Sequence, residues 1–371
     1  MRRPRPLLAA TLIVRDEAHQ LTDCLASLDG VVDEVVVYDT GSRDGTPDVA
    51  RHAGARVLQG YWDDDFARAR NAALEMTRAL WALIVDADER LVADGPVLRA
   101  VLAGHVPGQS GPVAGPGLHA RLGGLILQVV CRGVDGRFQA GHASVRVVRT
   151  DGARWEGRVH EVLRFGRPDL VRVQVAADVA RLDHLGYRDA DTVRAKAERN
   201  LAIAQAELDH LVASRSHDVA TGARVLFDLA RSALEVGQRQ RAVDALETLR
   251  EIAPEGPHRR LATGLLAQIL LDVGGFEQVA LALEAELRAD PRVDRRFTAW
   301  IRAQALAGLD RREEALELLR GIDRLVDHAG VEQPFSPVLR ARAVLAARAG
   351  HLAEARAALC ALEDGIEVEG S

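Results

Sequence analysis

The sequence has few cysteines, few aromatic residues and no long apolar segment. Its three cysteines, Cys24, Cys131 and Cys360, are far apart and odd in number, so no disulfide framework or zinc-site spacing is visible and a reducing compartment is expected. Aromatic residues make up only 4% of the chain, so we expect a core of aliphatic side chains, which suits packed helices. No run reaches the roughly 18 to 20 apolar residues that a membrane-spanning helix requires.

A surplus of basic residues is also lacking. The formal net charge of -6 argues against a dedicated nucleic-acid-binding protein, which would normally carry a basic stripe. The first 14 residues combine basic positions with an apolar run, as a signal peptide does. They lead directly into Arg15-Asp16-Glu17 without a good cleavage segment. We therefore expect a cytoplasmic protein.

The first half of the chain alternates short apolar runs with amphipathic stretches. This alternation predicts a mostly parallel sheet with helices on both faces, which binds ligands at the carboxyl ends of its strands. The expected strands are Leu7–Val14, Glu34–Tyr38, Arg56–Leu58 and Trp81–Val85, and the expected helices are His19–Leu28, Pro47–Ala53 and Phe66–Arg78. Further strands, expected to be antiparallel, are Leu125–Cys131, Ser144–Val148 and Arg158–Val162.

The second half has helical periodicity and an internal repeat. A turn residue followed five positions later by a small residue recurs at intervals of roughly 36 to 40 residues, close to the ~34 of tetratricopeptide helix pairs. The four instances are Gly237…Ala242, Gly274…Val279, Asp310…Ala315 and Gly350…Ala355. We expect an α/β domain over residues 1–188, a connecting helix over 189–217, and tetratricopeptide-like helical repeats over 218–371. Such repeats often form docking surfaces, so a homodimer or a protein acceptor is plausible.

The strongest local signal is Asp86-Ala87-Asp88, which follows the apolar run Trp81–Val85. Two carboxylates at the end of a buried strand suit a hard cation that carries phosphates. Mg²⁺ or Mn²⁺ needs only one or two protein carboxylates, because a diphosphate and water supply the other ligands. The pattern therefore predicts a site for a divalent cation and a diphosphate.

Three segments together resemble the family 2 glycosyltransferases, whose nucleotide-sugar-binding fold is called GT-A. They are Leu12–Glu17, Val35–Thr46 and Asp86–Glu89. The resemblance implies that Glu17 and Asp39 contact the base and ribose, that Asp86 lies near the ribose and sugar, and that Asp88 holds the metal. The neighbouring residues that complete the expected nucleotide-sugar site are Val14, Arg15, Ser42 and Ala87.

A narrower resemblance, to a bacterial subgroup of that family, covers about residues 7 to 201. Asp65–Ala73 is similar to the subgroup's "FAxARN" helix, Arg146–Arg149 to its "RLFR" strand and Gly157–Glu161 to its "GxVHE" segment. Asp183–Tyr187 with Lys196–Leu201 resembles its "HxGY…KxxRN" stretch. The subgroup includes peptide S-glycosyltransferases and lipopolysaccharide-core glucosyltransferases, some with C-terminal tetratricopeptide repeats. Val148 departs from the usual Phe, and the absent QxxRW signature argues against a processive polymerase.

Sugar transfer with inversion assigns a role to each remaining candidate. It needs a base for the acceptor and positive charge on the departing diphosphate. Glu161 is the expected base, with His160 as the rival, and His184 is expected to complete the metal shell. The cations expected to neutralise phosphate are Arg70, Arg146 and Lys196. The expected reaction moves one sugar from a nucleotide diphosphate sugar, UDP first and dTDP or GDP next, to a peptide, saccharide or small natural product.

Structural roles compete with these assignments. Arg70 could instead pair with Asp63–Asp65, Ser42 or Asp44 could cap a helix, and His184 could be a buried histidine with no metal. Trp62 and Trp155 could stack on a sugar or base, but they more often belong to the core. At the level of function, a sugar-nucleotide pyrophosphorylase would need a glycine-rich loop after the first strand, and no glycine precedes Gly30. A non-catalytic adaptor that uses the repeats for protein contacts is the main alternative.

Overall fold

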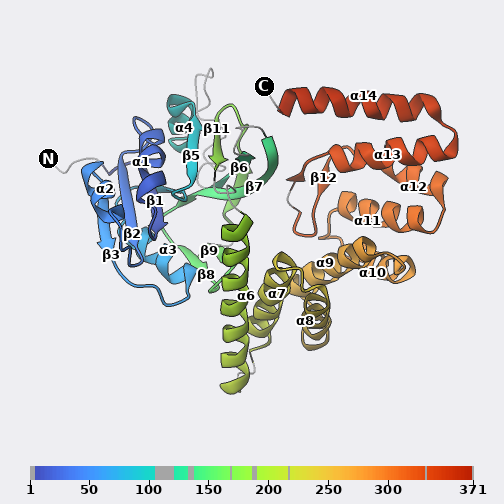
Figure 1. Cartoon of the computed structure of the whole chain (residues 1–371), viewed down its shortest axis with the longest axis horizontal. Helices are drawn as coiled ribbons and strands as arrows, with labels where there is room; N and C mark the ends of the chain where they lie inside the picture. The colour runs from blue at the N-terminus through green and yellow to red at the C-terminus, as the bar shows by residue number, and fades with distance from the viewer. Residues whose placement is uncertain are drawn as a thin grey trace. The chain divides into compact units, whose positions relative to one another are not determined.

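The computed structural model describes residues 5–104, 121–132, 138–167, 169–185, 190–215, 218–330 and 332–369. The chain divides into two compact units, Met1–Ala190 and Asp191–Ser371 (Figure 1). The first unit is a mixed α/β structure of the GT-A type, and the second consists of tetratricopeptide-like helices.

The first unit is built on one large mixed sheet. Its strands are β1 (Leu8–Val14), β2 (Glu34–Asp39), β3 (Arg56–Gln59), β4 (Trp81–Ile84), β5 (Glu89–Ala93), β6 (Leu122–Arg132), β7 (Phe138–Arg149), β10 (Val171–Gln174) and β11 (Ala180–His184). The order is β3-β2-β1-β4-β7-β6-β11-β5, with β10 paired to β6. Strands β1 to β4 pair in parallel, whereas β7 is antiparallel to β4 and β6. A separate hairpin contains β8 (Ala153–Glu156) and β9 (Val162–Phe165).

Helices pack on both faces of the sheet, as expected. They are α1 (Ala18–Ser27), α2 (Thr46–His52), α3 (Phe66–Glu75) and α4 (Gly95–Leu102). Side chains of α1, α2 and α4 share one core cluster with Leu8, Leu12 and Leu83. Side chains of α3 pack with Val36 and Ile84 in two clusters on the opposite face. Because successive strand residues point to opposite faces and helices cover both faces, the central strands β1 and β4 are buried along nearly their whole length.

One expected strand in this unit is wrong. Arg158–Glu161 lie in the loop before β9, and the strand begins only at Val162. The backbone φ is 98° at Gly157 and 52° at His160, which places both residues outside the extended region that a strand requires. The antiparallel pairing of β6 with β7 is confirmed.

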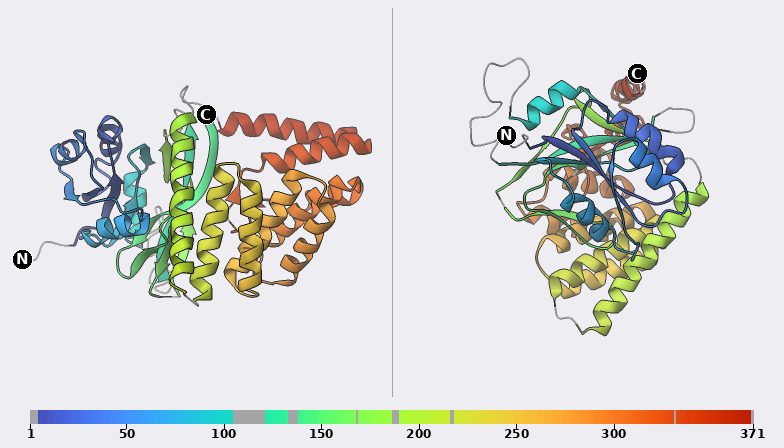
Figure 2. Two further views of the ribbon diagram at one scale, coloured as in Figure 1. Left: turned by 60° about the horizontal axis from the view of Figure 1, so that its bottom comes forward. Right: turned by 90° about the vertical axis from the view of Figure 1, so that its left-hand side faces the viewer.

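The second unit consists of consecutive helices. They are α6 (Ala190–Ala213), α7 (Val219–Glu235), α8 (Arg239–Ile252), α9 (Pro257–Val273), α10 (Glu277–Ala289), α11 (Arg295–Gly308), α12 (Arg312–Arg320), α13 (Ser336–Ala349) and α14 (Leu352–Glu369). The two-stranded pair β12 (Leu325–Val326) and β13 (Glu332–Gln333) lies between α12 and α13. From α7 to α14 each helix packs on the next, and the views in Figure 2 show these helices stacked side by side. No helix in the described part of the chain is long and apolar enough to cross a membrane.

The repeated small residues lie where the helices approach one another. Ala242 and Ala315 are completely buried and Ala355 is 6% exposed. The expected equivalent Val279 is wrong, because it is 48% exposed and its neighbour Ala280 is buried. The turn in that repeat contains two glycines, Gly274 and Gly275, so the five-residue spacing must be counted from the second.

Candidate active site

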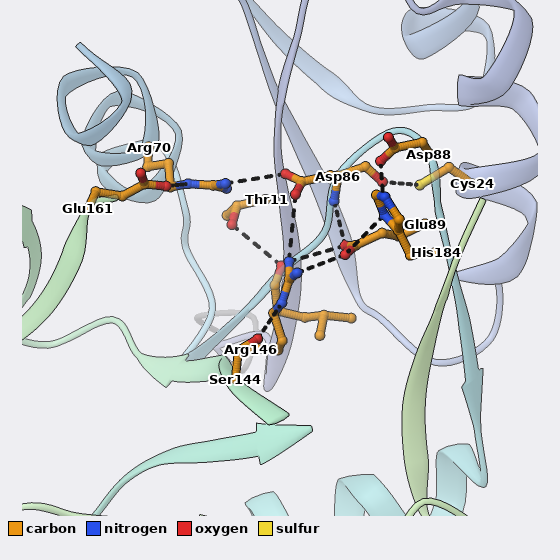
Figure 3. Close-up of polar contacts among 11 residues, drawn as sticks. Thr11, Cys24, Arg70, Asp86, Asp88, Glu89, Ser144, Arg146, Glu161 and His184 are labelled. Carbon is orange, nitrogen blue, oxygen red and sulfur yellow. Dashed lines mark hydrogen bonds and ion pairs between the residues drawn. The ribbon is translucent and has the colours of Figure 1, made fainter. Parts of the chain in front are cut away.

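The Asp86–Asp88 segment forms a tight turn between β4 and β5 at the carboxyl edge of the central strands (Figure 3). The Glu89 N–H donates to the Asp86 carbonyl at 3.0 Å, and the Asp86 N–H donates to Glu89 Oε2 at 2.9 Å. Cys24 Sγ lies 3.5 Å from the Asp86 carbonyl, and the Leu185 N–H donates to the Asp88 carbonyl at 2.8 Å. The turn is therefore held by contacts from β5, α1 and the end of β11.

Arg70, on α3, joins two of the predicted site carboxylates. Its Nε lies 2.5 Å from Glu161 Oε1 and its Nη2 lies 3.3 Å from Asp86 Oδ1. The guanidinium also lies 5.6 Å from the centre of the Trp155 ring. The alternative pairing of Arg70 with Asp63–Asp65 is wrong, because Arg70 faces the site.

The other polar residues of the Asp65–Ala73 segment hold α3 in place. Asp65 caps the helix by accepting from the Arg68 N–H at 2.8 Å. Arg68 Nε lies 2.6 Å from Asp63 Oδ2, and this arginine takes the pairing considered for Arg70. The Asn71 side chain donates to the Trp155 carbonyl and accepts from its N–H, both at 2.9 Å, and so fixes β8 to α3. Asp65, Arg68 and Asn71 therefore each have a structural role in this segment.

Arg146, on β7, is bound by Glu89. Its Nη2 lies 2.7 Å from Glu89 Oε1 and its Nη1 lies 3.1 Å from Glu89 Oε2. The Arg146 Nη1 also lies 3.7 Å from Asp86 Oδ2. In this structure both predicted phosphate-binding arginines of the first unit are therefore paired with carboxylates.

Asp88 and His184 form the candidate metal site. His184 Nδ1, at the end of β11, lies 3.5 Å from Asp88 Oδ1. Neighbouring ligands of an octahedral ion with bonds of about 2.1 Å lie about 3 Å apart, so both side chains fit one divalent cation. No group of three or more histidine, cysteine or acidic side chains within the described residues could hold a metal ion. Asp88 and His184 alone would leave most of the shell of such an ion to a diphosphate and water.

The surroundings shift the pKa values of the acidic groups of the site in different directions. Burial raises the pKa of Glu89 to about 7, although the charge of Arg146 opposes this shift. Burial also opposes ionisation of Asp86, but the charges of Arg70 and Arg146 outweigh it and lower the pKa of Asp86 below its ordinary value. Burial raises the pKa of the neighbouring Cys24 thiol to about 12, so this cysteine remains a neutral thiol.

The predicted nucleotide-binding loops after β1 and β2 are fixed to each other. The Asp16 N–H donates to Ser42 Oγ at 2.9 Å, and the Arg43 N–H donates to Asp16 Oδ1 at 2.7 Å. Asp39 is only 1% exposed and accepts from the N–H and hydroxyl of Ser42. Asp44 accepts from the N–H groups of Thr46 and Ala18, near the starts of α2 and α1.

The remaining residues predicted for this edge of the sheet fall into two groups. Arg15 is exposed, and Glu17 is half-buried at the start of α1. Val14 and Ala87 are buried, and the Val14 carbonyl accepts from the N–H and hydroxyl of Thr40. Contacts of all these residues with a nucleotide stay a prediction.

The predicted catalytic and phosphate-binding residues are divided between the units. His160 and Glu161 are half-buried in the loop before β9, where His160 has a left-handed backbone. Strained positions of this kind gather at functional sites. Lys196 belongs to the second unit, on an exposed part of α6, and its predicted phosphate contact stays a prediction.

Glu89 directly follows Asp88, yet the sequence pattern predicts no role for it. Both of its oxygens contact groups of the site, and it is 1% exposed. The signal in the sequence was a third acidic residue next to the Asp-x-Asp pattern, but its partner Arg146 is 57 positions away. Only the pairing of β4 with β7 brings the two together.

Comparisons with known proteins agree with this geometry. Residues 11–95 match the family described as "Glycosyl transferase family 2". A TPR repeat-containing protein from Synechococcus elongatus is 52% identical over 83 residues, which are 22% of this chain and 21% of that protein. The SPbeta prophage-derived glycosyltransferase SunS of Bacillus subtilis is 29% identical over 85 residues, 22% of this chain and 20% of SunS.

These matches span only about a fifth of each curated relative. Among solved structures, glucosyl-3-phosphoglycerate synthase from Mycobacterium tuberculosis, in complex with Mn²⁺ and UDP-glucose, has 17% identity and a TM-score of 0.32. That alignment covers 54% of this chain and 77% of the synthase. The sequence matches, together with the sheet and the Asp86–Asp88 turn, show that residues 11–95 form a glycosyl transferase family 2 segment, which tetratricopeptide-like helices follow in the chain.

Proposed function

We propose that the protein is a metal-dependent glycosyltransferase that moves one sugar, with inversion, from a nucleotide diphosphate sugar to a peptide, saccharide or small natural product. A UDP-sugar is the first donor to consider, with dTDP- and GDP-sugars next. One observation carries the proposal: the Asp86–Asp88 turn of a family 2 segment lies in a cluster with Arg70, Glu161 and His184.

The charges of the cluster support a divalent cation. The carboxylates are Glu161, Asp86, Glu89 and Asp88, and the guanidiniums are those of Arg70 and Arg146. When all four carboxylates are ionised and His184 is neutral, four negative charges face two positive ones. Two negative charges then remain, and one of them belongs to Asp88, beside His184. Bound there, Mn²⁺ or Mg²⁺ would offset this charge and stabilise the departing diphosphate.

Glu161 suits the role of base in this reaction. As the acceptor oxygen or sulfur attacks the anomeric carbon, its proton passes to Glu161. The bond from that carbon to the diphosphate then breaks, and the nucleoside diphosphate leaves. Arg70 orients the Glu161 carboxylate through the 2.5 Å contact, and its other nitrogen faces Asp86 on the donor side. His160 remains the alternative base.

Donor turnover tests this proposal. The full-length protein is incubated with UDP-, dTDP- and GDP-sugars, with and without Mn²⁺, and the released nucleoside diphosphate is measured with water or a peptide as acceptor. We expect metal-dependent release from one nucleotide class, strongly reduced in Glu161→Gln and retained in Arg51→Lys, a change in an exposed pair with Asp48. Loss in His160→Asn but not in Glu161→Gln would assign the base to His160. Release from no donor would contradict the enzymatic function.

A further inference from the structure

We propose that Glu89 is a positioning residue that holds the Asp86–Asp88 turn and Arg146 in the arrangement that binds the metal and diphosphate. The inference rests on the proposed function and adds a residue to its site. With 1% exposure, Glu89 is too buried to contact a substrate, so any effect on the reaction must pass through its neighbours.

Both carboxylate oxygens of Glu89 are used. Oε2 accepts from the Asp86 N–H at 2.9 Å and lies 3.1 Å from Arg146 Nη1. Oε1 lies 2.7 Å from Arg146 Nη2 and 3.8 Å from His184 Nδ1 (Figure 3). These three partners belong to β4–β5, β7 and β11, so one side chain joins three parts of the candidate site.

The turn leaves little freedom for the two aspartates. The Glu89 side chain accepts from the Asp86 N–H, and the Glu89 N–H donates to the Asp86 carbonyl. Two hydrogen bonds between the same two residues therefore close the turn. The Asp86 carboxylate then faces Arg70 and Arg146, while the Asp88 carboxylate faces His184 (Figure 3). A neutral or shorter side chain at position 89 would leave Arg146 free to move toward Asp86 and would loosen the turn.

A purely structural role does not explain the choice of an ion pair. Burying a carboxylate and a guanidinium costs solvation, and apolar residues of similar volume often stabilise a protein at least as well. Mutation of a residue that hydrogen-bonds to metal ligands without contacting the metal itself typically changes metal affinity or activity by about 10- to 100-fold. The contacts of Glu89 are of that kind, since they reach Asp86, Arg146 and His184.

The test measures metal affinity directly. Mn²⁺ binding to the full-length protein saturated with UDP is followed by electron paramagnetic resonance, and UDP binding without metal by calorimetry. For Glu89→Gln we expect Mn²⁺ affinity to fall about tenfold or more. Metal-free UDP affinity should fall less than Mn²⁺ affinity does, since Glu89 acts on the diphosphate only through Arg146. Asp151→Asn, which removes a carboxylate bound by Arg149 on the same strand, is the matched control and should bind Mn²⁺ like the wild type.

A second variant guards against misfolding. In Glu89→Leu/Arg146→Met an apolar pair replaces the ion pair, and we expect the fold to be retained with Mn²⁺ affinity still at least about tenfold weaker. Wild-type Mn²⁺ affinity in either folded variant would overturn the positioning role and leave the proposed function standing. A wild-type protein that binds no Mn²⁺ with any nucleotide would overturn the proposed function together with this inference.

Discussion

Arg70 Nε lies 2.5 Å from the carboxylate of Glu161, a residue 91 positions further along the chain. This contact ties helix α3 to the loop before β9. The same guanidinium reaches Asp86 in the turn after β4, so it links the candidate base to the candidate metal side of the site. The Arg70 guanidinium therefore contacts both the candidate base and a carboxylate of the candidate metal-binding turn.

Replacing Arg70 by lysine should strongly reduce sugar transfer. An ammonium is a compact point charge and does not bridge two carboxylates as the planar guanidinium does. We expect kcat/KM to fall by about 100-fold, the scale on which a misplaced catalytic group affects rate. The measurement is steady-state transfer or donor hydrolysis. A rate within threefold of the wild type would show that the bridge is not needed.

Asn71→Ala should destabilise the first unit. The side chain binds both backbone groups of Trp155, and its removal leaves both without this partner. We expect a loss of about 2 kcal/mol in the free energy of unfolding, since an unsatisfied polar group costs about 1 to 3 kcal/mol and Trp155 is only half-buried. Chemical denaturation measures the change. Asn71→Asp keeps the acceptor for the Trp155 N–H but places an oxygen against the Trp155 carbonyl, so it should also destabilise the protein, and equal stabilities of all three proteins would contradict the interpretation.

Local pattern was enough to predict the first four strands, the first three helices and the paired helices of the second half. The helices have a period of 3.6 and the strands are short apolar runs between clear turn residues, so both can be recognised from local sequence. Strands β5, β10 and β11 were missed, because they are four or five residues long and depend on pairing with distant strands. The false strand at Arg158–Val162 has an extended pattern, but Gly157 and His160 adopt positive φ.

Gly264→Ala should destabilise the second unit. A Cβ at Gly264, in α9, would lie 2.8 Å from the Cβ of His328 and 3.0 Å from the Phe297 ring. Overpacking of this kind costs about 1 to 3 kcal/mol, which outweighs the gain of up to about 1 kcal/mol in helix propensity. The matched control is Gly222→Ala in α7, where the nearest atom would be Ile252 Cδ1 at 3.4 Å. The unfolding temperature should fall for Gly264→Ala and should stay equal or rise for Gly222→Ala.

Acidification should weaken the contact between His328 and its neighbours. His328 lies between α12 and α13 and its ring packs edge-on against Phe227, with 6.0 Å between ring centres. Burial lowers the pKa of His328 below its ordinary value near 6.5, although Asp327 opposes the shift. The folded protein therefore binds fewer protons than the unfolded chain just below pH 6.5. The stability that depends on a neutral His328 is thus fully present above pH 6.5 and is lost as the pH falls.

Hydrogen exchange of α7 and α9 measured between pH 7 and pH 5, corrected for the intrinsic pH dependence of exchange, tests the role of His328. Protection should decrease on acidification in the wild type and decrease less in His328→Gln, which cannot take up a proton. An identical pH dependence of the two proteins would show that another group controls it.

The proximity of Asp86, Asp88 and His184 follows from their places at strand ends, and that of Arg70 from its place in the α3 motif. The structure links these four with Glu161, Arg146 and Glu89 in one chain of contacts, and their roles stay predictions. The partners themselves could not be predicted, because they depend on the three-dimensional pairing of β4 with β7 and of β11 with β5. Glu89 was overlooked for this reason.

The most direct test of the central claim is calorimetric binding of UDP, dTDP and GDP, with and without Mn²⁺, to the wild type and to Asp88→Ala. We expect one nucleotide to bind at least about tenfold more tightly with Mn²⁺, and Asp88→Ala to lose this gain while binding the metal-free nucleotide normally. Equal Mn²⁺ dependence in the variant would contradict the assignment of Asp88 as a metal ligand. Absence of binding by every nucleotide would contradict the account of a glycosyltransferase site.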